Sequence, residues 1–179
     1  MPPKNSTFER AGRKDTPAPT ARADGSTVKS ATGEAASKKP KKKVLFLCIG
    51  NACRSQMAEA IARHIASDVI EASSAGLSPL GYIAGPTVAV LMENGVSCEG
   101  QTSKSVRAAN PGSADLLINM SGYDVKNRLE PKDLPVEDWD VGDPFGSDLE
   151  IYRNIRDEVE RRVIELADRL RAPTPADSK

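Results

Sequence analysis

The 179-residue sequence is poor in aromatic residues, cysteine and histidine: aromatic residues make up 4% of it, and it holds three cysteines and one histidine. Three cysteines without paired spacing exclude a disulfide scaffold, and one histidine leaves no cluster for a metal. We therefore expect no metal and no cofactor. No apolar run reaches the roughly 18 residues of a membrane span, and the N-terminus lacks a secretory apolar stretch. A cytoplasmic protein without a membrane span is expected.

The formal net charge is zero, but charge is distributed unevenly along the chain. Residues 1–43 hold 11 Lys and Arg against 4 Asp and Glu, and their only sizeable apolar side chains after the initiator methionine are Phe8 and Val28. That is too little apolar surface to offset the entropy of ordering the chain. We predict a disordered basic tail there, one folded domain over 44–172 and a disordered C-terminus over 173–179. Because the tail has no interleaved aromatic residues, no nucleic acid partner is expected.

Strand-like and helix-like segments alternate through the domain. Short apolar runs are typical of buried parallel strands, and apolar residues at helical spacing predict helices, the first with Ser55 as its N-cap and the second ended by Gly95. The strands are expected at 44–48, 68–75, 114–120 and 136–141, and the helices at 56–67, 86–94 and 149–170. This alternation favours βαβ units. The predicted fold class is therefore α/β, a three-layer α/β/α arrangement around a four-stranded parallel sheet.

The loop after the first strand has the residues of an anion site, at the carboxyl end of a strand where open α/β sheets bind ligands. Its sequence is Cys48-Ile49-Gly50-Asn51-Ala52-Cys53-Arg54-Ser55. The N–H groups of a tight loop and the N-terminus of the following helix favour a phosphate-sized dianion, and Arg54 can clamp two of its oxygens. Gly50 and Asn51 tolerate the left-handed backbone angles that such a curved loop requires.

Cys48 is the candidate nucleophile of this loop. The helix end, the loop N–H groups and Arg54 favour its thiolate over its thiol, and Ser55 can donate a hydrogen bond to the sulfur. A thiolate beneath the phosphorus of a bound ester is suited to covalent catalysis, with the developing charge stabilised by preorganised donors. The remaining loop residues are the candidate substrate-binding residues: Ile49, Gly50, Asn51, Ala52, Cys53 and Ser55.

The segment Val44–Ser55 closely resembles the signature of the low-molecular-weight protein tyrosine phosphatases and the related thioredoxin-coupled arsenate reductases. The likeness continues through the last helix to about Leu170, and the later segments that carry it are Gln56–Ala60, Ser74–Gly76, Leu117–Met120, Asp143-Pro144 and Tyr152–Arg162. It implies a phosphatase I-like fold and chemistry through a phosphocysteine intermediate. Both branches use an aspartate of a late Asp-Pro turn, which implies that Asp143 is the general acid that protonates the leaving group.

The chain departs from both branches of the family. The reductases carry two further cysteines at the end of the third strand and just after it, whereas this chain has Met120–Asp124 there and no cysteine beyond Cys98. The phosphotyrosine enzymes usually have two tyrosines after Asp-Pro, and here the corresponding pair is Phe145-Gly146. One aromatic wall is kept, which makes Phe145 a further substrate-binding candidate in a shallower or wider pocket.

A cysteine-dependent phosphatase is the predicted function, because the cysteine, the arginine and the aspartate suffice for two-step hydrolysis while arsenate reduction needs a resolving thiol. The expected partner is a phosphorylated protein, above all one carrying phosphotyrosine, or a small phosphomonoester. The alternative is an arsenate reductase of the same fold that takes arsenate and an external thiol donor. A further alternative is a non-catalytic module that binds phosphate or senses redox state.

Cys53 is a candidate for redox regulation. In a loop curled around an anion, the sulfurs of Cys53 and Cys48 could approach bonding distance, and a reversible disulfide would then protect the nucleophile from overoxidation. The competing interpretation is that Cys53 is a small residue that packs the loop.

Overall fold

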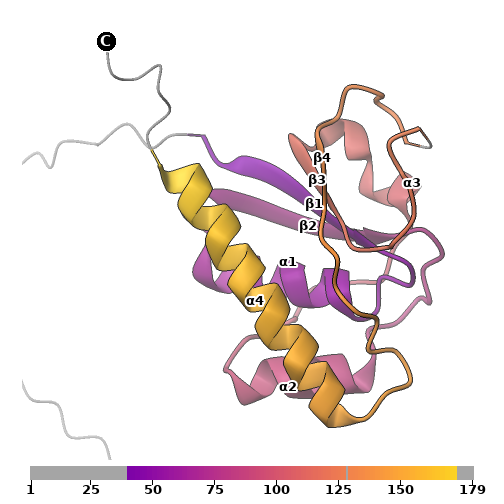
Figure 1. Ribbon diagram of the computed structural model, residues 1–179, viewed down its shortest axis with the longest axis vertical. Coiled ribbons are helices and arrows are strands. Elements are labelled where there is room, and N and C mark those ends of the chain that lie inside the picture. The colour runs from indigo at the N-terminus through magenta and orange to yellow at the C-terminus, as the bar shows by residue number, and fades with distance from the viewer. Residues whose placement is uncertain (1–39, 128, 173–179) are drawn as a thin grey trace, which may run out of the picture. The chain divides into compact units, whose positions relative to one another are not determined.

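The computed structural model describes residues 40–127 and 129–172 (Figure 1). Helices and strands alternate along the chain, and two short helical segments that the sequence did not predict join them. In chain order the elements are β1 (Lys42–Cys48), α1 (Arg54–Ile65), β2 (Ile70–Gly76), α2 (Gly85–Glu93), α3 (Val106–Ala109), the 3₁₀ helix η1 (Pro111–Ser113), β3 (Leu116–Asn119), β4 (Val136–Asp138) and α4 (Leu149–Arg171). No helix in this described part is long and apolar enough to cross a membrane.

The predicted four-stranded parallel sheet is confirmed, with the strand order β2-β1-β3-β4. β1 lies in the interior of the sheet between β2 and β3, and its segment from Val44 to Cys48 is buried. The chain passes from β1 to β2 on one side, and β3 pairs with β1 on the other side. The carboxyl end of β1 is therefore the point at which the strand order reverses, and open α/β sheets bind ligands at such a point.

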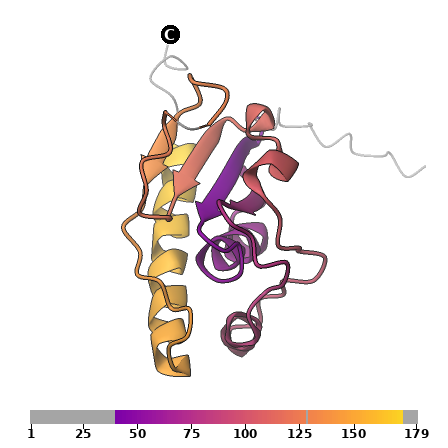
Figure 2. The same cartoon turned by 90° about the vertical axis from the view of Figure 1, so that its right-hand side faces the viewer.

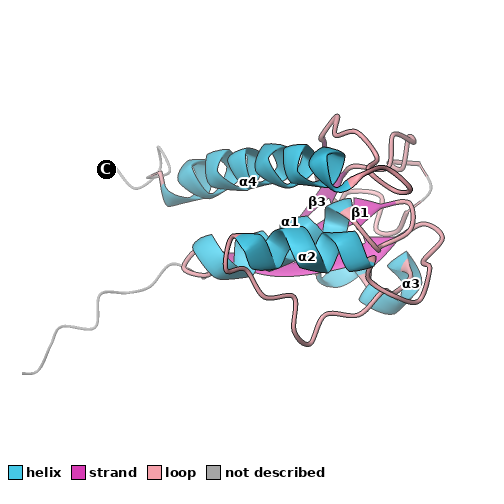
Figure 3. Cartoon of the chain, turned by 90° about the horizontal axis from the view of Figure 1, so that it is seen from below, coloured by secondary structure: helices cyan, strands magenta, loops and turns pink. Residues whose placement is uncertain are grey.

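Helices cover the two faces of the sheet unequally. On one face α1, α2 and α4 pack together over a core that includes Phe46, Met57 and Val159, and these three helices form the thicker layer seen in Figure 3. On the other face, α3 and the segment before β4 cover a smaller cluster around Leu47 and Val125. Figure 2 shows yellow α4 and α3 on opposite sides of the sheet. The three-layer prediction is confirmed, although α3 is only four residues long.

The start of α1 differs from the prediction. The helix begins at Arg54 instead of Gln56, and Cys53 occupies the N-cap position without a capping side-chain hydrogen bond. The prediction that Ser55 is the N-cap is wrong, because its hydroxyl is engaged by Cys48 and Asn51 instead of by the backbone N–H groups of the first turn. The first N–H groups of α1 are therefore not capped by a side chain and remain available as donors next to the loop.

The bounds of all four strands also shift, and β2 runs over Ile70–Gly76 instead of 68–75 and β3 over Leu116–Asn119 instead of 114–120. β1 begins at Lys42, because the last two residues of the predicted basic tail pair with β2. β4 ends at Asp138 instead of Val141, because the backbone carbonyls beyond it accept hydrogen bonds from arginine side chains. Residues 1–39 of the predicted tail and the predicted disordered C-terminus, 173–179, lie outside the described residues.

Candidate active site

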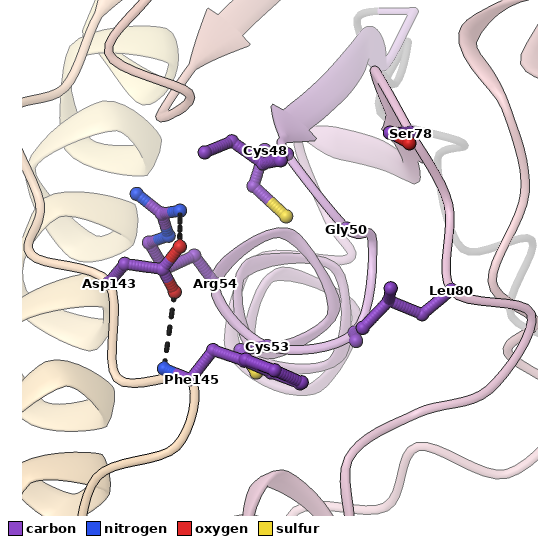
Figure 4. A pocket seen from close by; sticks show the side chains of 10 residues that line it. Cys48, Gly50, Cys53, Arg54, Ser78, Leu80, Asp143 and Phe145 are labelled. Carbon is purple, nitrogen blue, oxygen red and sulfur yellow. Dashed lines mark hydrogen bonds and ion pairs between the residues drawn. The ribbon is translucent and has the colours of Figure 1, made fainter.

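The loop between β1 and α1 surrounds a small pocket at the carboxyl edge of the sheet. Figure 4 shows Cys48 at the end of β1, with the loop in front of α1, which is seen end-on. The pocket has a volume of about 210 Å³. Its lining comes from the loop, the segment after β2 and the turn before α4: Cys48, Ile49, Gly50, Ala52, Cys53, Arg54, Ser78, Leu80, Asp143 and Phe145. The fold thus brings Asp143 and Phe145 to a loop that is distant from them in the sequence.

The backbone carbonyls of the loop are bound on its outer side. The carbonyls of the first three residues accept hydrogen bonds from the backbone of the segment 77–80, at 2.8 to 3.1 Å. The Asn51 carbonyl accepts from Gln56 Nε2 at 3.0 Å, and the Ala52 carbonyl accepts from two donors at the start of α2. Because the C=O and N–H of a trans peptide point in opposite directions, the N–H groups of Gly50, Ala52 and Cys53, which line the pocket, face inward.

The inward side of the loop is rich in unused donors. The backbone N–H groups of Gly50, Ala52 and Cys53 find no acceptor among the described residues, and all three residues line the pocket. The curvature that this requires places Asn51 at a left-handed φ of 46°, as predicted for this residue type. Together with the N-terminus of α1, the N–H groups form a site of positive potential suited to an anion.

Arg54 presents one edge of its guanidinium group to the pocket. Arg54 is 5% exposed, and its Nη1 donates to the carbonyls of Met120 at 2.7 Å and Val141 at 3.2 Å. These two bonds fix the plane of the group. Nη2 pairs with Asp143 Oδ2 at 2.5 Å, while Nε is buried and has no partner among the described residues. The Nε–Nη2 edge is therefore positioned to bind two oxygens of an anion.

Cys48 is 2% exposed, and its sulfur lies 3.0 Å from the hydroxyl oxygen of Ser55. That oxygen also accepts a hydrogen bond from Asn51 Nδ2 at 2.9 Å. With Asn51 as the donor in that bond, the Ser55 hydroxyl hydrogen is free to point at the sulfur. The Ser55 hydroxyl is therefore placed to donate a hydrogen bond to the Cys48 sulfur.

A buried polar network behind the loop was missed by sequence reasoning. Asn51 Nδ2 donates to Ser74 Oγ at 2.9 Å, and the Ser74 hydroxyl donates to the carboxylate of Glu59. Glu59 is 1% exposed and pairs with Arg63. The signal that could have found the network is a serine in a buried strand and a glutamate on the buried side of α1. Asn51 and Ser55 are not among the pocket-lining residues, and they brace the loop from behind.

Asp143 and two apolar side chains border the pocket. The Asp143 side chain is 42% exposed, and its Oδ1 accepts a hydrogen bond from the Phe145 N–H at 3.2 Å (Figure 4). Phe145 and Leu80 approach the pocket from opposite sides in the same view, and both are partly exposed. Leu80, from the segment after β2, is thus a second apolar side chain at the border of the pocket.

The three cysteines are free and lie in different surroundings. The Cys53 sulfur lies 3.5 Å from the Tyr152 hydroxyl, and burial raises the pKa of the Cys53 thiol and also the pKa of Tyr152. Cys53 is thus held as a neutral thiol. Cys98 lines a separate groove with Met92 and Val96, and it is not among the residues that line the pocket of Cys48.

The comparisons with known proteins agree with this geometry. The sequence model of the family described as "Low molecular weight phosphotyrosine protein phosphatase" matches residues 43–175. A "Glutaredoxin arsenate reductase" from Synechocystis sp. is 36% identical over 125 residues, which cover 68% of this chain and 93% of that protein.

Solved structures show the same relationship. "An arsenate reductase in the phosphate binding state" is 35% identical with a TM-score of 0.65, over 72% of this chain and 98% of that chain. The YwlE arginine phosphatase from Geobacillus stearothermophilus is 27% identical with a TM-score of 0.66, over 72% of this chain and 92% of that chain. The resemblance of the loop signature is confirmed, and the chain belongs to the low molecular weight phosphotyrosine protein phosphatase family.

Proposed function

We propose that the protein is a cysteine-dependent phosphatase that hydrolyses phosphomonoesters through a phosphocysteine intermediate. The observation that carries the proposal is the buried Nε of Arg54, which has no partner among the described residues and belongs to a side chain in the pocket wall. A buried donor without an acceptor costs about 1–3 kcal/mol, and a bound anion removes that cost. A phosphoryl group offers oxygens both to Nε and to the inward N–H groups of the loop.

In the first step, the Cys48 thiolate attacks phosphorus and the bond between phosphorus and the ester oxygen breaks. The electron pair of that bond goes to the leaving oxygen, which takes the proton of Asp143. The phosphoryl oxygens are held by Arg54 and the loop N–H groups. One of these oxygens replaces the Asp143 carboxylate on Nη2 of Arg54, and the released carboxylate takes up a proton from solvent before it acts as the acid.

In the second step, water attacks the phosphorus of phosphocysteine and the phosphorus–sulfur bond breaks. Cys48 leaves as a thiolate, which the Ser55 hydroxyl stabilises. Asp143, now a carboxylate, takes a proton from the attacking water, and inorganic phosphate is released. The cycle restores every group and needs no oxidant or reductant.

The proposed substrate is phosphotyrosine on a protein. Two apolar side chains border the pocket, Leu80 and Phe145, and they are 42% and 54% exposed before a substrate is bound. A phenyl ring between them would remove apolar surface from water. Aromatic contact between that ring and Phe145 adds to this.

Arsenate reduction is the second candidate function, favoured by the names of two relatives given above. Arsenate shares the tetrahedral shape and charge of phosphate, and Cys48 would bond to arsenic as it would to phosphorus. Reduction of arsenate to arsenite needs two electrons from thiols. Cys98 lines a separate groove and no cysteine follows it in the sequence, so an external thiol, such as that of a glutaredoxin, would supply them.

The test is steady-state hydrolysis of an aryl phosphate by the wild type, Cys48→Ser and Asp143→Asn, with Cys98→Ser as the matched control outside the pocket. We expect no turnover by Cys48→Ser, a kcat about 10² to 10⁴-fold lower in Asp143→Asn, and an unchanged Cys98→Ser. Absence of vanadate-sensitive hydrolysis by the wild type would contradict the proposal. Arsenate-dependent oxidation of NADPH, coupled through glutaredoxin, would then support the second candidate.

A further inference from the structure

The peptide between Asn51 and Ala52 is the part of the loop whose orientation depends on a single side chain. Every other carbonyl from Cys48 to Cys53 accepts at least one hydrogen bond from a backbone N–H group. Within the described part of the chain, the Asn51 carbonyl accepts only from Nε2 of Gln56, at 3.0 Å. Gln56 alone therefore keeps this carbonyl on the outer side of the loop.

The direction of this peptide decides the sign of the potential at the pocket wall. With the carbonyl outward, the N–H group of Ala52 faces the pocket, and Ala52 is one of the lining residues. A flipped peptide would turn that N–H group away and bring the Asn51 oxygen toward the bound anion. The site would lose a donor and gain a repulsive acceptor at the same position.

A second glutamine fixes the direction of the Gln56 amide. Gln56 Nε2 donates also to the Thr102 carbonyl at 3.1 Å, while its Oε1 accepts from Gln101 Nε2 at 2.8 Å. If the Gln56 amide were rotated by half a turn, its oxygen would face two carbonyl oxygens. Gln56 is fully buried, so that water cannot replace the lost donors.

The arrangement of Gln101 carries an energetic cost that supports this interpretation. Its Nε2 donates both to the side chain and to the backbone carbonyl of Gln56, while its own Oε1 is buried without a partner among the described residues. An unpaired buried acceptor is unfavourable. Gln101 thus leaves its own Oε1 unpaired within the described part of the chain, and in this orientation its amide group donates both of its hydrogen bonds to Gln56.

We infer that Gln56, oriented by Gln101, is a positioning residue for anion binding: it holds the Asn51–Ala52 peptide so that the Ala52 N–H group donates to a bound oxyanion. The inference rests on the proposed function in one respect, namely that a phosphoryl oxygen is the acceptor. It assigns Gln56 no contact with the substrate.

The test compares Gln56→Met with Thr87→Val. Methionine preserves most of the volume of glutamine and removes both donors, whereas Thr87→Val removes a side-chain donor to the neighbouring Ala52 carbonyl, which keeps its bond from the Ala84 N–H at 3.1 Å. Both changes delete a side-chain hydrogen bond to a loop carbonyl, and Gln56→Met also deletes the bonds of Gln56 with Thr102 and Gln101. In calorimetric titration with inorganic phosphate, we expect the Kd to rise about 10-fold or more in Gln56→Met, and to stay within a factor of about 2 in Thr87→Val.

A spectroscopic readout separates positioning from loss of stability. In ¹⁵N–¹H spectra, the Ala52 amide of the wild type and of Thr87→Val should shift downfield when phosphate binds, and this shift should be lost in Gln56→Met. Equal phosphate affinities and equal Ala52 shifts in the two variants would overturn the inference. If the wild type binds neither phosphate nor vanadate, the proposed function and the inference fall together.

Gln101→Met provides the second variant if Gln56→Met does not fold. It leaves every side-chain donor of Gln56 in place and removes the two bonds that Gln101 donates to Gln56, one to its backbone carbonyl and one to Oε1, which sets the direction of its amide. We expect phosphate affinity between those of the wild type and Gln56→Met, with a weakened Ala52 shift. Wild-type affinity with a normal Ala52 shift would count against the role assigned to Gln101 and to the orientation of Gln56.

Discussion

Replacing Gly76 by alanine tests how closely β2 must approach the anion-binding loop. A Cβ at this position would lie 2.8 Å from the backbone nitrogen of Asn51, 2.8 Å from the carbonyl oxygen of Ile49 and 2.9 Å from the Asn51 Cβ. Ordinary contacts of a Cβ lie at 3.4 to 4 Å. The loop backbone would have to move by roughly 0.5 Å or more, because no flexible side-chain end is available to yield.

The expected effects of Gly76→Ala on stability and on phosphate binding follow from the displacement of the loop backbone. Overpacking of this kind costs about 1–3 kcal/mol of unfolding free energy. The displaced atoms belong to the loop that presents its N–H groups to the anion, and removal of a single oxyanion donor costs about 10² to 10³-fold in kcat. Since the donors would be misaligned instead of removed, we expect inhibition by phosphate to weaken about 10-fold, which corresponds to about 1.4 kcal/mol.

The assay pairs urea unfolding with inhibition of aryl phosphate hydrolysis by phosphate, and Gly85→Ala is the matched control. A Cβ at Gly85, in the first turn of α2, would meet no atom within 4 Å, so this variant should be unchanged or more stable by about 0.4–1 kcal/mol. If Gly76→Ala and Gly85→Ala unfold at the same urea concentration and are inhibited equally by phosphate, the close approach of β2 has no role in shaping the loop.

Three further variants test the clamp, the second loop cysteine and a surface ion pair. Arg54→Lys keeps the charge but removes Nε and the planar fork, so inhibition by phosphate should weaken about 100-fold; an unchanged inhibition constant would refute the bidentate clamp. Cys53→Ser should lose the recovery of activity by dithiothreitol after peroxide treatment if a disulfide with Cys48 protects the nucleophile, whereas equal recovery would show that it does not. Hydrogen bonding from Arg171 lowers the pKa of Asp68 from 3.8 to about 2. A lowered carboxyl pKa stabilises the native state above pH 3.8, and this contribution is lost as the pH falls through about 2; urea unfolding of Arg171→Met should therefore depend less on pH across that window than that of the wild type.

The order of the main strands and helices was predictable because apolar runs and helical spacing in the local sequence indicate each of them. The buried run of β1 needs no distant partner to be recognised, and the curved loop after it has its nucleophile, clamp and permissive residues within eight positions. The position of Asp143 was predictable from the family resemblance alone. No local pattern indicates that its carboxylate lies 2.5 Å from Arg54.

The supporting residues could not be predicted, because they depend on the register between strands and on loops without periodicity. Ser74 meets Asn51 since β2 pairs in parallel with β1, with Cys48 opposite Gly76. Leu80 becomes a pocket wall since its N–H donates to the Gly50 carbonyl at 2.9 Å. Both contacts join segments separated by a whole helix, and a one-dimensional pattern does not contain them.

Arg54 couples the anion site to the turn that carries the acid. Its Nη1 holds the carbonyl of Met120 after β3 and that of Val141 after β4, and Val141 lies two residues before Asp143. Nη2 holds the Asp143 carboxylate, and an anion that binds the Nε–Nη2 edge must take that place. In the proposed mechanism, binding of the phosphoryl group and release of the carboxyl group are therefore one exchange on a single side chain. The exchange involves Nε and Nη2 and not the backbone bonds of Nη1, so we expect these bonds to keep the turn of Asp143 near the leaving oxygen.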